Sequence, residues 1–218
     1  MNDLFPILAV ETSGELCSIA LLLDGKRHIE LNYSDKHIHS QKLMGMIDSV
    51  INSSPIELND LKSIAVSMGP GSFTGLRIGL SAAKGIAFGL NLPIIPVPTF
   101  NALAHHAGNY IQEGIKFTIA VSANMEEIYF SRFIRREERA EVLEELKLIE
   151  KKDLHALLGK DEIVLGDWGV GKAANTVSAP GAKSIGEWAY LYGKDLLTFE
   201  YDYLEPNYFK KFIVKAGR

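Results

Sequence analysis

The sequence has little cysteine and no long hydrophobic run. Cys17 is the single cysteine among 218 residues, so the chain cannot form an intrachain disulfide framework and suits a reducing compartment. Because Cys17 alternates with Ile19 and Leu21, we expect it to be a small buried hydrophobic residue rather than a nucleophile. No stretch reaches the roughly 18 consecutive apolar residues of a membrane helix, and the short apolar run that starts at Ile7 has no basic region before it. We therefore expect a cytoplasmic protein with no signal peptide, no membrane span and no membrane partner.

The sequence also lacks an excess of positive charge. The chain has 23 lysines and arginines against 27 aspartates and glutamates, which gives a formal net charge of -4. This balance argues against a large basic surface for nucleic acid on this chain alone. If RNA takes part in its function, we expect another protein to hold it.

The histidines lack the spacing of a metal site. Neither H-E-x-x-H nor H-x-x-x-H occurs among the six histidines. His105 and His106 are adjacent, so on a helix they point about 100° apart and cannot share one metal ion. His37 and His39 lie at the start of a helical pattern that supplies no third ligand, and we expect them to be exposed or capping. The sequence predicts no metal site.

What the sequence does have is a distinctive stretch from Ser63 to Leu90. It opens with the alternating apolar residues of a strand, passes through the glycine-rich turn GPGSFTG, and continues as a helical pattern to about Gly89. Ser72 or Thr74 can cap this helix. The turn has neither the lysine of a P-loop nor the glycine spacing of a Rossmann fold, so phosphate binding at this turn remains only one possibility.

The expected helix has two non-polar faces. Its core stripe consists of Leu76, Leu80, Ala83, Ala87 and Leu90, and its second stripe consists of Gly75, Gly79, Ala82, Ile86 and Gly89. Each interior glycine costs about 1 kcal/mol of helix stability relative to alanine, so close approach of another backbone should compensate. Two interpretations remain open: both faces are buried within one domain, or the second face contacts another subunit.

The other patterns predict two similar halves. In the first half we expect strands over residues 7–10, 16–23, 26–32 and 93–97, the last at a sheet edge, and helices over residues 40–51 and from Thr99 onward. In the second half we expect strands over residues 117–121, 128–134, 141–149 and 162–165, and helices over residues 153–158 and 184–197. The same order of strands, turns and helices in both halves suggests that the halves are structurally related.

Polar side chains follow the first expected strand. Glu11, Thr12 and Ser13 place a carboxylate, two hydroxyls and several N–H groups at a strand end, where such groups can hold phosphate or a nucleotide. The same residue types also form turns in which they satisfy only the local backbone. Both interpretations of these three residues remain open.

Several segments resemble a known family. ILAVETSGELCSIALLLDG, HSQKL and above all GPGSFTGLRIGLSAAKGIA are similar to the bacterial TsaB (YeaZ-like) proteins, and Glu205 to Tyr208 resembles that family's closing Pro-x-Tyr element. The likeness is close over about residues 7–104 and looser beyond them. It implies an α/β, actin-like ATPase (ribonuclease H-like) fold of two lobes with mixed sheets. On this basis we divide the chain into an N-terminal lobe (1–104), a divergent second lobe (105–203) and a tail (204–218) that packs back on the first lobe.

The resemblance also implies a function in making threonylcarbamoyladenosine, the modified adenosine beside the tRNA anticodon. Proteins of this family are noncatalytic partners of a paralogous, metal-binding TsaD-like transferase, and a TsaE-like ATPase joins the pair. Alone they form homodimers through the same face, and tRNA binds only within the complex. We therefore expect an accessory subunit with no activity and no cofactor of its own, and with ATP or ADP at most at the partner interface.

The family's pairing face carries over to the first two long helices of this chain. The expected subunit interface consists of Ser40, Leu43, Met44, Ile47, Gly71, Ser72, Phe73, Thr74, Gly75, Leu76, Gly79, Ala82, Ala83 and Ile86.

The chain also departs from the family. Glu11 stands where the family usually has an aspartate, and Ser122, Asn124 and Glu126 stand where it tends to have Asp, Arg and Gly. A kinase of this fold needs acidic residues between its lobes, so these departures argue against an independent ATPase.

One alternative is a small-molecule kinase or ATPase of the same fold that acts alone through Glu11, Thr12 and Ser13. Another is a glycoprotein peptidase, but a peptidase would need a metal motif or a Ser/His/Asp arrangement that the sequence does not display.

Overall fold

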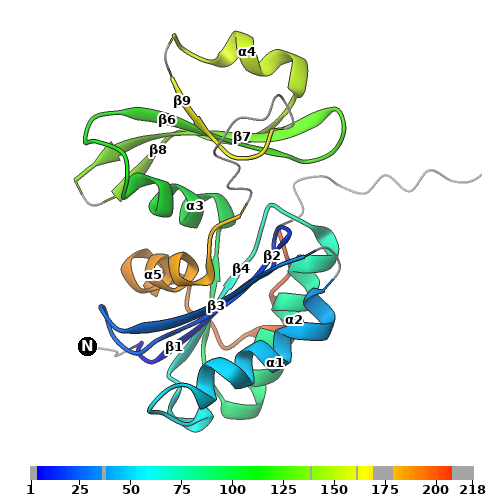
Figure 1. The fold of residues 1–218 in the computed structure, drawn as a ribbon, viewed down its shortest axis with the longest axis vertical. Helices are drawn as coiled ribbons and strands as arrows, with labels where there is room; N and C mark the ends of the chain where they lie inside the picture. The colour runs from blue at the N-terminus through cyan, green and yellow to red at the C-terminus, as the bar shows by residue number, and fades with distance from the viewer. Residues whose placement is uncertain (1–3, 36–37, 138, 161, 169–178, 208–218) are drawn as a thin grey trace, which may run out of the picture.

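The computed structural model describes residues 4–35, 38–137, 139–160, 162–168 and 179–207 (Figure 1). These residues form one sheet in the strand order β3-β2-β1-β4-β5 and another in the order β8-β7-β6-β9. Helices α3 and α5 lie between the two sheets, and α1 and α2 lie on the outer face of the first (Figure 1).

The first sheet is built around β1, every residue of which is buried. Its strands are β1 (Ile7–Glu11), β2 (Leu16–Leu22), β3 (His28–Ser34), β4 (Ser63–Ser67) and β5 (Ile94–Val97). The first three form an antiparallel meander, and β4 and β5 continue the sheet in parallel on the other side of β1. The predicted meander and the predicted edge position of β5 are confirmed. A strand covered on both faces is apolar throughout, which is why residues 7–10 show no alternation.

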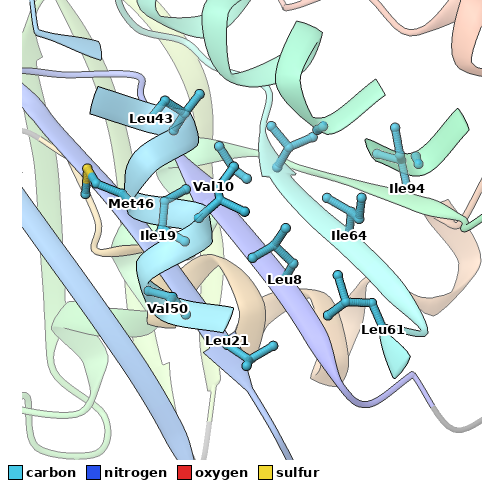
Figure 2. Packing of buried hydrophobic residues seen from close by; sticks show 14 of the residues in the cluster. Leu8, Val10, Ile19, Leu21, Leu43, Met46, Val50, Leu61, Ile64 and Ile94 are labelled. Carbon is cyan, nitrogen blue, oxygen red and sulfur yellow. The ribbon is translucent and has the colours of Figure 1, made fainter. Parts of the chain in front are cut away.

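Three helices cover the first sheet. They are α1 (His39–Asn52), α2 (Phe73–Leu90) and α5 (Ala182–Tyr192). Residues of α1 and α2 share a buried cluster with Leu8 and Val10, whereas α5 packs with Ile7 and Ala9 on the opposite face. Figure 2 shows Leu43, Met46 and Val50 of α1 on the side of the sheet that carries Val10 and Ile19. Successive residues of β1 thus point into two different cores.

The second sheet repeats the first in outline. Its strands are β6 (Lys116–Ser122), β7 (Glu127–Arg136), β8 (Arg139–Glu150) and β9 (Ile163–Leu165). Helix α3 (Thr99–Gly108) packs on one face, and Leu154 of the short helix α4 (Leu154–Leu157) packs on the other. Short 3₁₀ turns are η1 (Leu58–Asp60), η2 (Lys151–Asp153), η3 (Lys194–Leu196) and η4 (Tyr201–Tyr203).

The predicted relation between the halves is confirmed. In each sheet an antiparallel hairpin is followed by a strand that pairs in parallel with the hairpin's first strand.

Some expectations need correction. Residues 182–192 belong to the second lobe in our division of the chain, but α5 packs on the first sheet, because Ala182, Ile185 and Ala189 fill the core on the face opposite α1 and α2. Helix α3 does begin at Thr99, as expected, and the Thr99 hydroxyl oxygen accepts a hydrogen bond from the Gly69 N–H (3.0 Å).

Near the end of the described chain, the Asn207 N–H donates to the Met68 carbonyl oxygen (2.7 Å), and Leu204 packs on the first core. His37, Tyr208 and the rest of the tail through residue 218 lie outside the described residues.

Candidate functional site

The end of β1 lies directly against the start of α2. The Ser72 N–H donates to the Ser13 carbonyl oxygen (2.7 Å), and the Thr12 hydroxyl donates to the Gly75 carbonyl oxygen (2.8 Å). A Cβ atom at Gly71 or Gly75 would overlap the carbonyl oxygens of Ser13 and Thr12 respectively. The glycine-rich turn is therefore shaped to accept the chain's own strand end, because only glycine permits this approach.

The need for glycine at position 79 is explained in the same way. A Cβ at Gly79 would overlap the Thr12 side-chain oxygen, whereas a Cβ at Gly85 or Gly89 would meet nothing within 4 Å. The small-residue stripe therefore divides into two parts. Its first part, Gly75 and Gly79, lies against Thr12 of the same chain, whereas Gly89 has no such neighbour. This corrects the interpretation that another subunit accounts for Gly79.

Burial divides the predicted interface residues as well. Six of them, Leu43, Ile47, Gly75, Leu76, Gly79 and Ala83, are buried inside the chain. Of these six, Leu43 also lines the groove described below. The sequence alone does not show which side of α2 faces the sheet, and the interface as a whole stays a prediction. The surface members are Ser40, Met44, Gly71, Ser72, Phe73 and Thr74, with Ala82 and Ile86 half-buried.

The surface members from α1 and α2 meet at a groove. It has a volume of about 620 Å³ and is lined by Ser40, Leu43, Met44, Phe73, Thr74, Arg77, Ile78, Ser81 and Ala82. Met44 is 51% exposed and Phe73 is 36% exposed, so large apolar side chains reach solvent here. The Arg77 guanidinium lies 4.3 Å from the centre of the Phe73 ring and so adds a positive group to the wall.

Sequence reasoning missed part of this groove. Arg77, Ile78 and Ser81 line it, yet they belong to neither non-polar stripe of the helix. Their spacing from Thr74 by three, four and seven residues was the available signal, since such residues share a helix face.

Glu11 is fully buried at the end of β1. Burial raises the pKa of its carboxyl from 4.5 to about 7, although the Ser13 hydroxyl and N–H and the Ser67 hydroxyl act to lower it. One carboxylate oxygen, Oε1, accepts a hydrogen bond from the Ser13 N–H. Within the described residues, the other oxygen, Oε2, and the Ser67 hydroxyl have no hydrogen-bond partner of normal geometry.

The polar turn does not fit a phosphate or nucleotide as it stands. Glu11, Thr12 and Ser13 are all buried, the Thr12 hydroxyl bonds to Gly75, and the Ser13 N–H bonds to Glu11. The Thr12 hydroxyl, the Ser13 N–H and one Glu11 oxygen therefore bond within the chain, and phosphate or nucleotide binding by the three residues stays a prediction. In the second lobe the corresponding turn is also self-bonded, since the Asn124 side-chain oxygen accepts from the N–H groups of Glu126 and Glu127, both at 2.9 Å.

The histidines have separate partners. His105 Nε2 lies 3.7 Å from a Glu187 carboxylate oxygen, and His106 Nδ1 lies 3.1 Å from the Ser184 hydroxyl. His39 is buried, with its Nε2 3.4 Å from the Leu16 carbonyl oxygen, so our expectation of an exposed or capping residue was wrong.

Metal-binding clusters and membrane helices are both absent from the part of the chain that the structure describes. It contains no group of three or more His, Cys, Asp or Glu residues suited to a metal ion. None of its helices has the length and hydropathy needed to cross a bilayer. Cys17 is buried, as predicted, and burial followed by the nearby Glu11 charge raises the pKa of its thiol to about 11.

Comparison with known proteins adds a family context. Residues 33–156 match the family model of TsaD, tRNA N6-adenosine threonylcarbamoyltransferase. The tRNA threonylcarbamoyladenosine biosynthesis proteins TsaB of Haemophilus influenzae and Escherichia coli are each 37% identical, over 62% and 60% of this chain. The matched stretch spans 56% of each of those two proteins, little more than half their length. TsaB of Buchnera aphidicola subsp. Schizaphis graminum is 31% identical over 91% of this chain and 93% of its own.

Solved structures share the fold. YeaZ from Pseudomonas aeruginosa superposes with a TM-score of 0.78 at 22% identity, over 93% of this chain and 98% of that one. A second P. aeruginosa structure, described as an uncharacterized protein with similarity to peptidase YEAZ, gives 0.79 at 24% identity, over 94% and 99%. These likenesses confirm the predicted α/β fold of two lobes with mixed sheets.

Proposed function

Because the chain belongs to the TsaB (YeaZ-like) family and has its actin-like fold, we propose that it is a noncatalytic subunit of the apparatus that makes threonylcarbamoyladenosine on tRNA. In this proposal it docks a TsaD-type transferase through the groove between α1 and α2. The transferase catalyses the reaction, and this chain holds the transferase in position.

The groove is the observation that carries the proposal. It is concave, it exposes Met44 and Phe73, and it is formed by the two helices whose sequence carries the family likeness. Exposed large apolar side chains gathered in one hollow are typical of protein interaction sites. Association that buries them gains roughly 25 cal/mol for each Å² of apolar surface removed from water, before the costs of ordering the partners.

Two further features fit a noncatalytic subunit. The polar turn of Glu11, Thr12 and Ser13 is buried and bonded to its own chain, so the alternative of a kinase or ATPase that acts through these residues has no open site there. The net charge of -4 suits a chain that leaves tRNA to its partner.

Other partners remain predictions. We expect a TsaE-like ATPase to join the complex, ATP or ADP to bind at most at the boundary with the transferase, and tRNA to bind only the assembled complex. Alone, the chain should pair with a second copy through the same groove, so the homodimer and the mixed dimer should exclude each other. A complex in which one copy of this chain binds both a second copy and the transferase through its groove would contradict this.

The test is to mix the purified chain with the TsaD-family transferase of the same genome and measure the mass of the complex by light scattering after gel filtration. Met44→Asp and Ala82→Arg place charge in the groove and should abolish the mixed dimer. Phe88→Arg is the matched control, because Phe88 is 79% exposed at the far end of α2 and does not line the groove. Gly79→Arg is unsuitable, since Gly79 lies against Thr12 and the variant should disturb folding.

The outcomes separate the alternatives. Loss of the mixed dimer with both groove variants but not with Phe88→Arg, together with loss of tRNA modification, supports the proposal. Unchanged complex formation by Met44→Asp and Ala82→Arg contradicts the docking surface. ATP turnover by the isolated chain contradicts the noncatalytic function.

A further inference from the structure

The last described residues run along α2 from its C-terminal end to its N-terminal end. The Tyr201 hydroxyl donates to the Leu92 carbonyl oxygen (2.6 Å), just beyond the C-terminal end of the helix. Further along, Pro206 is buried, and the Asn207 N–H donates to the Met68 carbonyl oxygen (2.7 Å), just before the glycine-rich turn. This course brings the chain to the end of α2 at which the groove begins.

Asn207 lies beside the first turn of α2. The position that a Cβ at Gly69 would take is 3.1 Å from the Asn207 carbonyl oxygen and 3.0 Å from Leu76 Cδ1. Leu76 is one helical turn from Phe73, which lines the groove and is 36% exposed. The residues that follow Asn207 are therefore tethered next to the rim of the groove that Phe73 forms.

The sequence after Asn207 is rich in apolar residues. Residues 208–218 lie outside the described part of the chain, and their sequence is YFKKFIVKAGR. From Tyr208 to Val214 every residue is a large apolar one except for two lysines. Each large apolar side chain gains free energy when it leaves water, so such a run is stabilised by any hollow that can bury it.

The groove fits this segment in length and in character. On α2 its lining extends from Phe73 to Ala82, about 14 Å at 1.5 Å per residue. Residues 208–214 reach up to about 24 Å when extended, so the tether is long enough. Met44, which is 51% exposed, and Phe73 offer apolar surface. Among the described residues that line the groove, Arg77 alone carries a charge, so we expect the lysines of the segment to point to solvent.

We propose that residues 208–214 occupy the groove between α1 and α2 in the monomer and must leave it before a second copy or a transferase can bind there. The apolar side chains of the segment then take the place that the partner would take, and they lower its apparent affinity. Competition with a transferase rests on the function proposed above, whereas occupation of the groove by the segment does not.

The size of the effect follows from tethering. A short tether gives an effective concentration of about 1 mM. A segment that binds the groove with an intrinsic dissociation constant of about 0.1–0.5 mM would then fill it in a ratio between about 2:1 and about 10:1. A competing partner would bind about threefold to elevenfold more weakly than it binds an open groove.

The first experiment is photo-crosslinking of the chain alone. A photoreactive residue replaces Ser81 in the groove, or Phe88 on the same helix outside it, and the crosslinked peptides are identified by mass spectrometry. Position 81 should crosslink to residues 208–214 and position 88 should not. An equal mixture of isotope-labelled and unlabelled chains shows whether both peptides come from one molecule.

Each outcome of this experiment decides the proposal. Crosslinks within one molecule from position 81 alone support it. Crosslinks from position 81 only to another molecule, equal crosslinking of the segment from both positions, or none from position 81 overturn it.

The second experiment measures competition in the full chain. Phe209→Ala combined with Phe212→Ala removes two large apolar side chains, and Lys211→Ala combined with Lys215→Ala is the matched control. By titration calorimetry with the TsaD-family transferase of the same genome, the phenylalanine variant should bind about threefold to elevenfold more tightly than the wild type, and the lysine variant should bind like the wild type.

The failure of the competition and the failure of the proposed function are distinguishable. Equal or weaker binding of the phenylalanine variant overturns the competition. If no form of the chain binds the transferase, the proposed function fails, and the crosslinking result alone decides whether the segment occupies the groove.

Discussion

The contact between Thr12 and Gly79 makes a sharp prediction about two glycines of one helix. Gly85→Ala adds a methyl group in open space, so it should stabilise the chain by up to about 1 kcal/mol through helix propensity. Gly79→Ala gains the same propensity but drives the methyl group into the Thr12 hydroxyl, which is buried and bonded to Gly75.

The magnitude for Gly79→Ala follows from three contributions. Overpacking costs about 1–3 kcal/mol, and loss of the Thr12 hydrogen bond costs about 1 kcal/mol, while helix propensity returns up to about 1 kcal/mol. The net expectation is a destabilisation of about 1–3 kcal/mol, opposite in sign to Gly85→Ala.

Urea unfolding measures both free energies of unfolding, with the slope expected to stay constant. A double-mutant cycle isolates the contact, because Thr12→Ala removes the group that the new methyl meets. In the Thr12→Ala background the cost of Gly79→Ala should fall by at least about 1 kcal/mol. If Gly79→Ala stabilised the chain as much as Gly85→Ala does, Gly79 would not lie against Thr12, and the intramolecular explanation of the stripe would be refuted.

Three further predictions concern single groups. Ser72→Ala removes the N-cap of α2 and should lower the free energy of unfolding by about 1 kcal/mol in urea titration, whereas Ser81→Ala on the same helix should change it by less than about 0.5 kcal/mol. Arg132→Ala leaves the nearly buried Glu162 carboxylate without its ion pair at 2.7 Å and should cost about 3 kcal/mol by thermal or urea unfolding, while Arg139→Ala in an exposed pair should cost less than about 1 kcal/mol. The pKa of Glu11 is higher in the folded state than in the unfolded state, so its stabilising contribution is complete below pH 4.5, declines as pH rises to about 7 and is lost above it. The free energy of unfolding of Glu11→Gln should therefore rise by up to about 3 kcal/mol relative to the wild type between pH 4.5 and pH 8. Parallel pH profiles of the two proteins would contradict this.

The local elements of the fold could be predicted from the sequence. The apolar run at residues 7–10, the period of α1 and α2, and Ser72 as a helix cap all depend on residues near one another in the chain, and the structure confirms them. Local pattern suffices there because hydrogen bonding within a helix or hairpin is itself local.

Long-range contacts could not be predicted in the same way. The sequence indicated that Gly79 needs a close neighbour, but Thr12 lies far away in the chain. Only the packing of α2 against the end of β1 brings the two residues together. A helix over residues 184–197 could be predicted, yet nothing local shows that α5 crosses back to the first sheet. The groove residues Arg77 and Ser81 were missed because exposed residues of mixed character resemble an ordinary solvated helix face.

Site-specific photo-crosslinking tests the docking surface most directly. A photoreactive residue replaces Ser81, an exposed member of the groove, or Phe88, on the same helix but outside it, and each protein is irradiated with the TsaD-family transferase of the same genome. We predict a crosslinked pair from position 81 and none from position 88. Crosslinking from position 88 and not from position 81 would contradict the account.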